Sequence, residues 1–124
     1  MQQSGGDKVK IFIIDKIKFR CSMMELVLKS QGMEVFSVNS ADDSLYLIKD
    51  LRPDLLILDG ETISSTNDTT FLDCFRQSEE ISSTPALVIG NDFDISLPNF
   101  KGFVHNPVSA VAIIQKVKEA LNRP

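Results

Sequence analysis

The fold of this chain is decided by residues 52–60, which read Arg52-Pro53-Asp54-Leu55-Leu56-Ile57-Leu58-Asp59-Gly60. Consecutive apolar residues run directly into a single carboxylate, Asp59. A run that is apolar on both faces is typical of a strand buried on both sides, as at the centre of a parallel sheet. Asp59 would then end a central strand, at the edge where ligands collect in open α/β sheets. Asp also ends strands merely as a turn residue, so this stretch alone leaves both interpretations open.

Length and composition favour one domain with an ordinary hydrophobic core. The chain has 124 residues, of which 43% are hydrophobic, and a formal net charge of −4. Its single scale of hydrophobic patterning predicts a flexible lead-in at residues 1–8 and one domain at residues 9–124. Proteins that bind nucleic acids usually present a basic face, and the net negative charge of this chain argues against one. We therefore do not expect nucleic-acid binding.

Cysteine usage and apolar runs exclude further classes of protein. Cys21 and Cys74 lack the Cys-x-x-Cys spacing, and the single histidine, His105, cannot complete the four ligands of a structural zinc site. The first residues have no apolar core typical of a signal peptide, and no run approaches the length that spans a membrane. We therefore expect a cytoplasmic protein that does not bind membranes. His105 has no ligand or acid–base partner beside it in the sequence, so we expect it to be structural.

Apolar runs and helical spacing alternate along the chain. Strands are expected at residues 9–14, 34–38, 55–58, 85–90 and 102–105. Helices are expected at residues 17–31, between an N-cap at Ser40 (with Asp43 as capping-box partner) and Pro53, at residues 71–78, and from Pro107 to Leu121. Residues 60–70 and 91–101 are expected to be loops, so that the fourth helix of the alternation is shortened or missing.

Alternating strands and helices predict an α/β fold, a three-layer αβα sandwich around a parallel sheet. Right-handed crossovers leave few topologies, and the flavodoxin-like strand order 2-1-3-4-5 fits best. The first and third strands are then central neighbours. Asp15 and Asp59, which follow them, should emerge side by side at the carboxyl edge.

Two adjacent carboxylates would suit a divalent cation, and Mg²⁺ prefers hard oxygen ligands of this kind. Such a site can hold a phosphoryl group near a nucleophilic aspartate, which would form an aspartyl phosphate. That chemistry needs further parts. It needs a second acid for the metal, a cation that steadies the phosphoryl oxygens, and a hydroxyl group that senses them.

Short motifs recur in order along the chain: Ile-Ile-Asp15, Gly32, Ser44-Leu45-x-x-Ile48, Pro53-Asp54-Leu-Leu-Ile-Leu-Asp59, Thr84-Pro85-Ala-Leu-Val-Ile and Gly102-Phe103-x-x-Asn106-Pro107. Together they resemble the receiver domain of two-component response regulators, over about residues 9–122. The resemblance implies that Asp59 is the phosphoacceptor position, Asp15 the first member of an acidic pair, and Phe103 an aromatic switch position. It also implies that any Mg²⁺ ion would bind Asp15, Asp59 and the backbone carbonyl of Glu61. No enzyme activity is implied beyond autophosphorylation and autodephosphorylation at Asp59.

The chain lacks the Met-Pro and Gly that the family has in the loop after the phosphoacceptor, and it also departs from the family pattern at three single positions. The second acid is replaced by Lys16, the hydroxyl residue after the fourth strand by Gly90, and the lysine before the proline by Asn106. We hypothesise that Lys16 pairs with Asp15 and Asp59 as a permanent internal cation. The alternative is that Lys16 points to solvent.

These departures favour a receiver-like signalling module that acts through protein–protein contact, with phosphorylation at Asp59 impaired or absent. Its partner would be a signalling protein or a histidine kinase, bound through the face of the fourth strand, fifth strand and last helix around Phe103 and Val108. The alternative is a working receiver that accepts a phosphoryl group on Asp59 from a histidine kinase with Mg²⁺. A flavodoxin-type cofactor binder would need a small, hydroxyl-rich phosphate loop after the first strand, where this chain reads Asp-Lys-Ile-Lys-Phe-Arg.

Overall fold

The computed structural model of the chain describes residues 8–42, 44–64, 70–90 and 97–121. These residues form one five-stranded parallel sheet in the order β2-β1-β3-β4-β5. The predicted fold class and strand order are therefore confirmed. The strands are β1 (Lys10–Ile14), β2 (Glu34–Val38), β3 (Leu55–Asp59), β4 (Ala86–Ile89) and β5 (Phe100–Val104).

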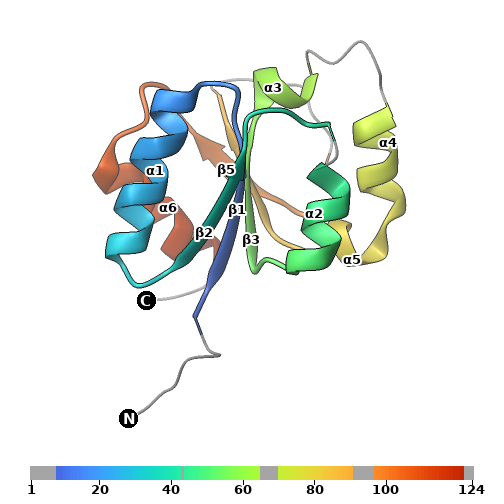
Figure 1. Cartoon of the computed structure of the whole chain (residues 1–124), viewed down its shortest axis with the longest axis horizontal. Helices are drawn as coiled ribbons and strands as arrows, with labels where there is room; N and C mark the ends of the chain where they lie inside the picture. The colour runs from blue at the N-terminus through green and yellow to red at the C-terminus, as the bar shows by residue number, and fades with distance from the viewer. Residues whose placement is uncertain (1–7, 43, 65–69, 91–96, 122–124) are drawn as a thin grey trace.

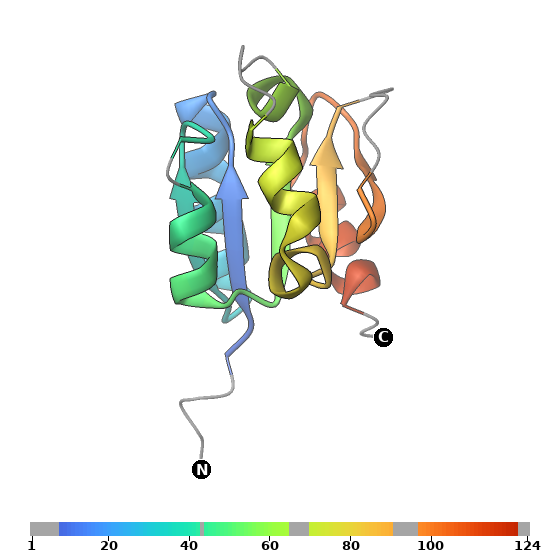
Figure 2. The ribbon, with the colours of Figure 1, turned by 90° about the vertical axis from the view of Figure 1, so that its right-hand side faces the viewer.

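Helices cover both faces of the sheet. In Figure 1, α1 and α6 lie on one face, and α2, α4 and α5 lie on the other. Figure 2 shows the strand arrows pointing toward the end of the molecule where α3 lies. The helices are α1 (Lys18–Ser30), α2 (Ser44–Leu51), α3 (Gly60–Ser64), α4 (Thr70–Gln77), α5 (Glu79–Ser82) and α6 (Ala110–Ala120).

The apolar run that ends at Asp59 is the centre of the core. Every residue of β3 is buried, because β1 and β4 flank it and helices cover both of its faces. Ile57 packs with Met24 and Leu28 of α1, while Leu58 packs with the cluster on the α2 side. Burying one such side chain fully contributes about 1.5–3 kcal/mol, so this strand fixes the position of the carboxylate that follows it.

Several predicted boundaries are corrected. Residues 60–64 form the short helix α3 rather than the start of a loop, and Glu79 begins a separate helix, α5. Both segments are too short for a helical apolar stripe, although Ser78 caps α5 by accepting a hydrogen bond from Ile81. β5 begins at Phe100, ahead of the predicted start at residue 102.

The predicted helix starts at Ser40 and Pro107 are also wrong. Ser40 accepts a hydrogen bond from the backbone of Asp42, which makes a local turn, and α2 begins only at Ser44. The last helix begins at Ala110, because the hydroxyl group of Ser109 accepts the backbone N–H of Ala112 and caps it. The capping role predicted for Asp43, the lead-in at residues 1–7 and the loop residues 65–69 and 91–96 lie outside the described residues. In the described part of the chain, no helix is both long and apolar enough to span a membrane.

Candidate functional site

Asp15 and Asp59 lie together at the carboxyl edge of the sheet. β1 and β3 pair in parallel with Ile14 opposite Leu58, so the aspartate that follows each of these residues emerges beside the other. Asp15 is 0% and Asp59 is 3% exposed, and carboxylates as buried as these need charged or hydrogen-bonding partners. The neighbours of these two side chains therefore decide what the site can do.

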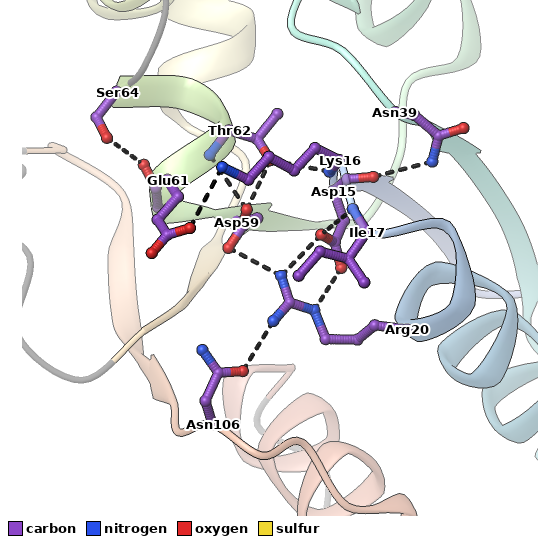
Figure 3. Close-up of polar contacts among 11 residues, drawn as sticks. Asp15, Lys16, Ile17, Arg20, Asn39, Asp59, Glu61, Thr62, Ser64 and Asn106 are labelled. Carbon is purple, nitrogen blue, oxygen red and sulfur yellow. Dashed lines mark hydrogen bonds and ion pairs between the residues drawn. The ribbon is translucent and has the colours of Figure 1, made fainter.

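The partner of both carboxylates is Arg20, in the first turn of α1. Its Nε donates to Oδ2 of Asp15 at 2.6 Å, and its Nη2 donates to Oδ1 of Asp15 at 2.7 Å. The same Nη2 lies 3.0 Å from Oδ1 of Asp59, and Nη1 donates to Oδ1 of Asn106 at 2.8 Å (Figure 3). The planar fork of a guanidinium group matches a carboxylate with two parallel hydrogen bonds, and here it also reaches a second carboxylate.

The guanidinium group of Arg20 stays positively charged in these surroundings. Hydrogen bonding to Asp15 raises the pKa of Arg20 above its ordinary value, although burial acts in the opposite direction, and the charges of Asp15 and Asp59 raise it further. Since an arginine is already protonated throughout the working range of proteins, Arg20 is a permanent cation between the two carboxylates.

Thr62 holds the other carboxylate oxygen of Asp59. Its hydroxyl group donates to Oδ2 of Asp59 at 2.6 Å, and its backbone N–H reaches the same oxygen at 3.1 Å. This contact forms because α3 begins immediately after β3 and turns residue 62 back over the carboxylate. The backbone N–H of Lys16 in turn donates to the Thr62 hydroxyl oxygen at 2.9 Å. Both oxygens of Asp59 are thus engaged.

The predicted pairing of Lys16 with Asp15 and Asp59 is wrong. The Nζ atom of Lys16 lies 3.3 Å from Oε2 of Glu61, in a pair whose side chains are 47% and 63% exposed. Successive side chains along an extended backbone leave on opposite sides, so the residue after the inward-facing Asp15 is directed outward. The internal cation exists, but Arg20 supplies it.

Of the predicted switch positions Gly90, Phe103 and Asn106, all within the described residues, only Asn106 contacts the cluster around Arg20 directly. Asn106 joins the cluster through its hydrogen bond from Arg20. Gly90 directly follows β4 and donates its backbone N–H to the carbonyl oxygen of Val104. Phe103 is half-buried, with its ring centroid 4.9 Å from that of Phe100, and the exposed His105 ring lies 6.5 Å from the Phe103 ring. The structure therefore brings Asp15, Asp59 and Asn106 together around Arg20, whereas Phe103 lies on the edge strand β5, outside this cluster.

An open groove with a volume of about 680 Å³ leads to this cluster. Arg20, Asp59 and Asn106 are among its lining residues, and its lining surface is mostly apolar. The remaining lining residues are Ile17, Phe19, Met23, Glu61, Pro107 and Val108.

The residues of the site do not fit a Mg²⁺ ion. The carboxylate oxygens that would bind a hard cation are already bonded to the guanidinium group of Arg20 or to Thr62. Within the described ranges, no group of three or more His, Cys, Asp or Glu residues is arranged to hold a metal ion. The positive charge in the pocket is supplied by the side chain of Arg20 instead.

Sequence reasoning missed Arg20 and Thr62. Arg20 follows Asp15 by five residues, which allows a long side chain in the first turn of the following helix to return to the strand end. Thr62 follows Asp59 by three residues, the spacing at which a side chain before a helix meets the third residue of that helix. Both spacings are visible in the sequence, but neither is specific without the fold.

Comparison with protein-family models gave no match, and comparison with curated proteins gave none either. Solved structures do match. A candidate response regulator from Chloroflexus aurantiacus is 25% identical, with a TM-score of 0.77 over 94% of this chain and 100% of that chain. A two-component response regulator from Clostridium difficile is 20% identical, with a TM-score of 0.74 over 94% and 98% of the two chains. The chemotaxis response regulator CheY4 of Vibrio cholerae is 19% identical, with a TM-score of 0.75 over 92% and 99%. The chain therefore has the fold of response-regulator receiver domains.

Proposed function

We propose that the chain is a receiver-like signalling module of two-component type that acts through protein–protein contact, with phosphorylation at Asp59 impaired or absent. One observation carries the proposal: both carboxylate oxygens of Asp59 are held, one by Arg20 and the other by Thr62. The fold and the positions of Asp15 and Asp59 support the signalling class.

Phosphorylation of Asp59 requires a carboxylate oxygen to attack phosphorus while the leaving group departs. Oδ1 would have to give up the guanidinium group of Arg20, and Oδ2 would have to give up two hydrogen bonds from Thr62. Arg20 is a poor substitute for a metal ion toward phosphate, because Asp15 already neutralises it through two short hydrogen bonds. Gly90 and Asn106 supply neither a hydroxyl group nor a charge to recognise the product.

The proposed contact surface is the face formed by β4, β5 and α6. β5 is the edge strand of the sheet, and Phe100 on it is 38% exposed beside Phe103. Val111 in the first turn of α6 is 75% exposed. Exposed apolar side chains beside an edge strand support a protein partner, which we propose to be a signalling protein or a histidine kinase. A cytoplasmic location is part of this proposal, and the free cysteines Cys21 and Cys74 suit a reducing compartment.

The test is the intact mass of the protein after incubation with a small-molecule acyl phosphate and Mg²⁺. The expected result is no phosphoryl adduct, while circular dichroism shows that the fold is intact. The D59N variant, treated in parallel, identifies any adduct that forms elsewhere on the chain.

A working phospho-receiver is the second candidate function. It is favoured by the juxtaposition of Asp15 and Asp59 at the ends of neighbouring strands. An adduct of one phosphoryl group on the wild type that is lost in D59N would establish this function and overturn the first proposal.

A further inference from the structure

We infer that Arg20 is a built-in replacement for a divalent cation, and that removing its guanidinium group turns the pocket of Asp15 and Asp59 into a divalent-cation site. The inference deepens the proposed function, on which it rests for its biological meaning, because it identifies what holds this pocket in one state. It follows from the charge, the position and the surroundings of one side chain.

The charge balance of the pocket depends on Arg20. Asp15 and Asp59 are almost fully buried and lie side by side, so their negative charges repel each other in surroundings that screen them poorly. Among the described residues, Arg20 is the only cationic side chain that forms an ion pair with either of them. Its removal leaves two adjacent carboxylates without a counter-ion, and this arrangement attracts a hard cation.

The position of the guanidinium group excludes a metal ion from the intact pocket. Nη2 lies between the two carboxylates, 2.7 Å from Oδ1 of Asp15 and 3.0 Å from Oδ1 of Asp59. A cation that bridges the same oxygens cannot be present at the same time. The Arg20 side chain is only 13% exposed, so it fills this space rather than lying over it.

The surroundings provide access and enough ligands once the guanidinium group is gone. The groove of about 680 Å³ reaches Arg20 and Asp59, and shortening Arg20 extends it to the carboxylates. Mg²⁺ and similar ions keep several waters and are commonly held by only one or two carboxylates. Lys16 does not take the place of Arg20, because its ammonium group pairs with Glu61 at the surface.

The same side chain also joins parts of the fold that are far apart in the sequence. Through Nη1, Arg20 binds Asn106, which lies between β5 and α6, while its other nitrogens bind the ends of β1 and β3. The guanidinium group therefore combines a single positive charge between the two carboxylates with a directional hydrogen bond to the segment before α6. A divalent ion in the variant would again supply a counter-ion to both carboxylates, but it would not replace this hydrogen bond.

The test is the binding of Mn²⁺ to the full-length R20A variant, followed by the electron paramagnetic resonance signal of the free ion. We expect one ion per chain with a dissociation constant on the order of 1 mM or tighter, and at least tenfold weaker binding to the wild type. The matched control is K16A, which also removes a cation near the end of β1 but leaves the guanidinium group in place. K16A should bind Mn²⁺ no better than the wild type does.

A second variant and a second measurement keep the test decisive if R20A unfolds. R20Q preserves part of the side-chain packing, and added Mn²⁺ should raise the melting temperature of either variant but not that of the wild type. Adding D59N to R20Q should abolish that increase. Equal binding by wild type and variants, or no binding and no stabilisation in both R20A and R20Q, would overturn the inference. A phosphoryl adduct on the wild type would refute the proposed function alone, so the two failures are distinguishable.

Discussion

Two cation–carboxylate contacts lie at the same edge of the sheet and differ in depth. Arg20 pairs with Asp15 and Asp59 at side-chain exposures of 13%, 0% and 4%. Lys16, only four residues earlier, pairs with Glu61 at exposures of 47% and 63%. Breaking a buried ion pair typically costs about 3–5 kcal/mol, whereas an exposed one contributes about 0–1 kcal/mol. Depth, rather than the sign or number of charges, therefore decides which of these contacts shapes the pocket.

The largest expected effect is that of R20A. Removing the guanidinium group should lower the free energy of unfolding by about 3–5 kcal/mol, because it leaves two buried carboxylates without a counter-ion. Urea denaturation followed by circular dichroism, in buffer without divalent ions, measures this loss. A loss below about 1 kcal/mol would mean that the buried cluster contributes no more than the surface pair.

The next largest effect is expected at Asp15, and it should exceed the effect at Asp59. D15N should cost about 2–3 kcal/mol, because Asp15 accepts two hydrogen bonds from the guanidinium group of Arg20 and that group then loses its closest charge. D59N should cost less, since only Nη2 of Arg20 reaches it and an amide oxygen can still accept from Thr62. Urea midpoints of both variants, measured side by side, give the order, and a larger loss in D59N would contradict it.

A smaller effect is expected at Thr62. The T62V variant keeps the shape of the side chain but loses the hydroxyl group that donates to Asp59 and accepts from the backbone of Lys16. The expected loss is about 1–2 kcal/mol, because the partly buried N–H of Lys16 loses its acceptor while Oδ2 of Asp59 keeps only the backbone N–H of Thr62. T62S, which keeps the hydroxyl group, is the control and should recover most of this loss in the same denaturation assay.

The smallest effect is expected at the surface pair. K16A should change the free energy of unfolding by less than about 0.5 kcal/mol, because the Lys16–Glu61 pair is exposed and screened by solvent. Denaturation at low and high salt should give the same difference from the wild type within that range. A loss comparable to that of R20A would show that Lys16, and not Arg20, is the cation on which the pocket depends.

The sheet could be predicted because its signals are local and its topology is restricted. The run at Leu55–Leu58 and the similar run before Asp15 are apolar on both faces, and right-handed crossovers then bring the two strands together. The meeting of the two carboxylates follows from that order alone. The short helices α3 and α5 could not be predicted in this way, since a helix of four or five residues has too few positions for an apolar period.

The composition of the site was harder to predict than its location. The sequence favours the lysine beside Asp15 as its counter-ion, but direct adjacency in an extended backbone places that side chain on the outer side of the strand end. Arg20 reaches the carboxylates only because α1 starts at Lys18 and turns its first residues back over the sheet edge. Long side chains with several rotatable bonds are positioned by such details of the backbone, which sequence patterns specify poorly.

Because Arg20 is a covalent part of α1, the cation in this pocket has no dissociation equilibrium with the surrounding solution. A bound metal ion leaves when a chelator is added or when its concentration falls, whereas an encoded side chain is present in every copy of the protein at a fixed stoichiometry. The electrostatic state of the sheet edge is therefore inherited with the sequence and is independent of the ion supply of the cell. Because Arg20 lies in the first turn of α1, the position of that helix relative to the strands sets how the cation meets the two carboxylates.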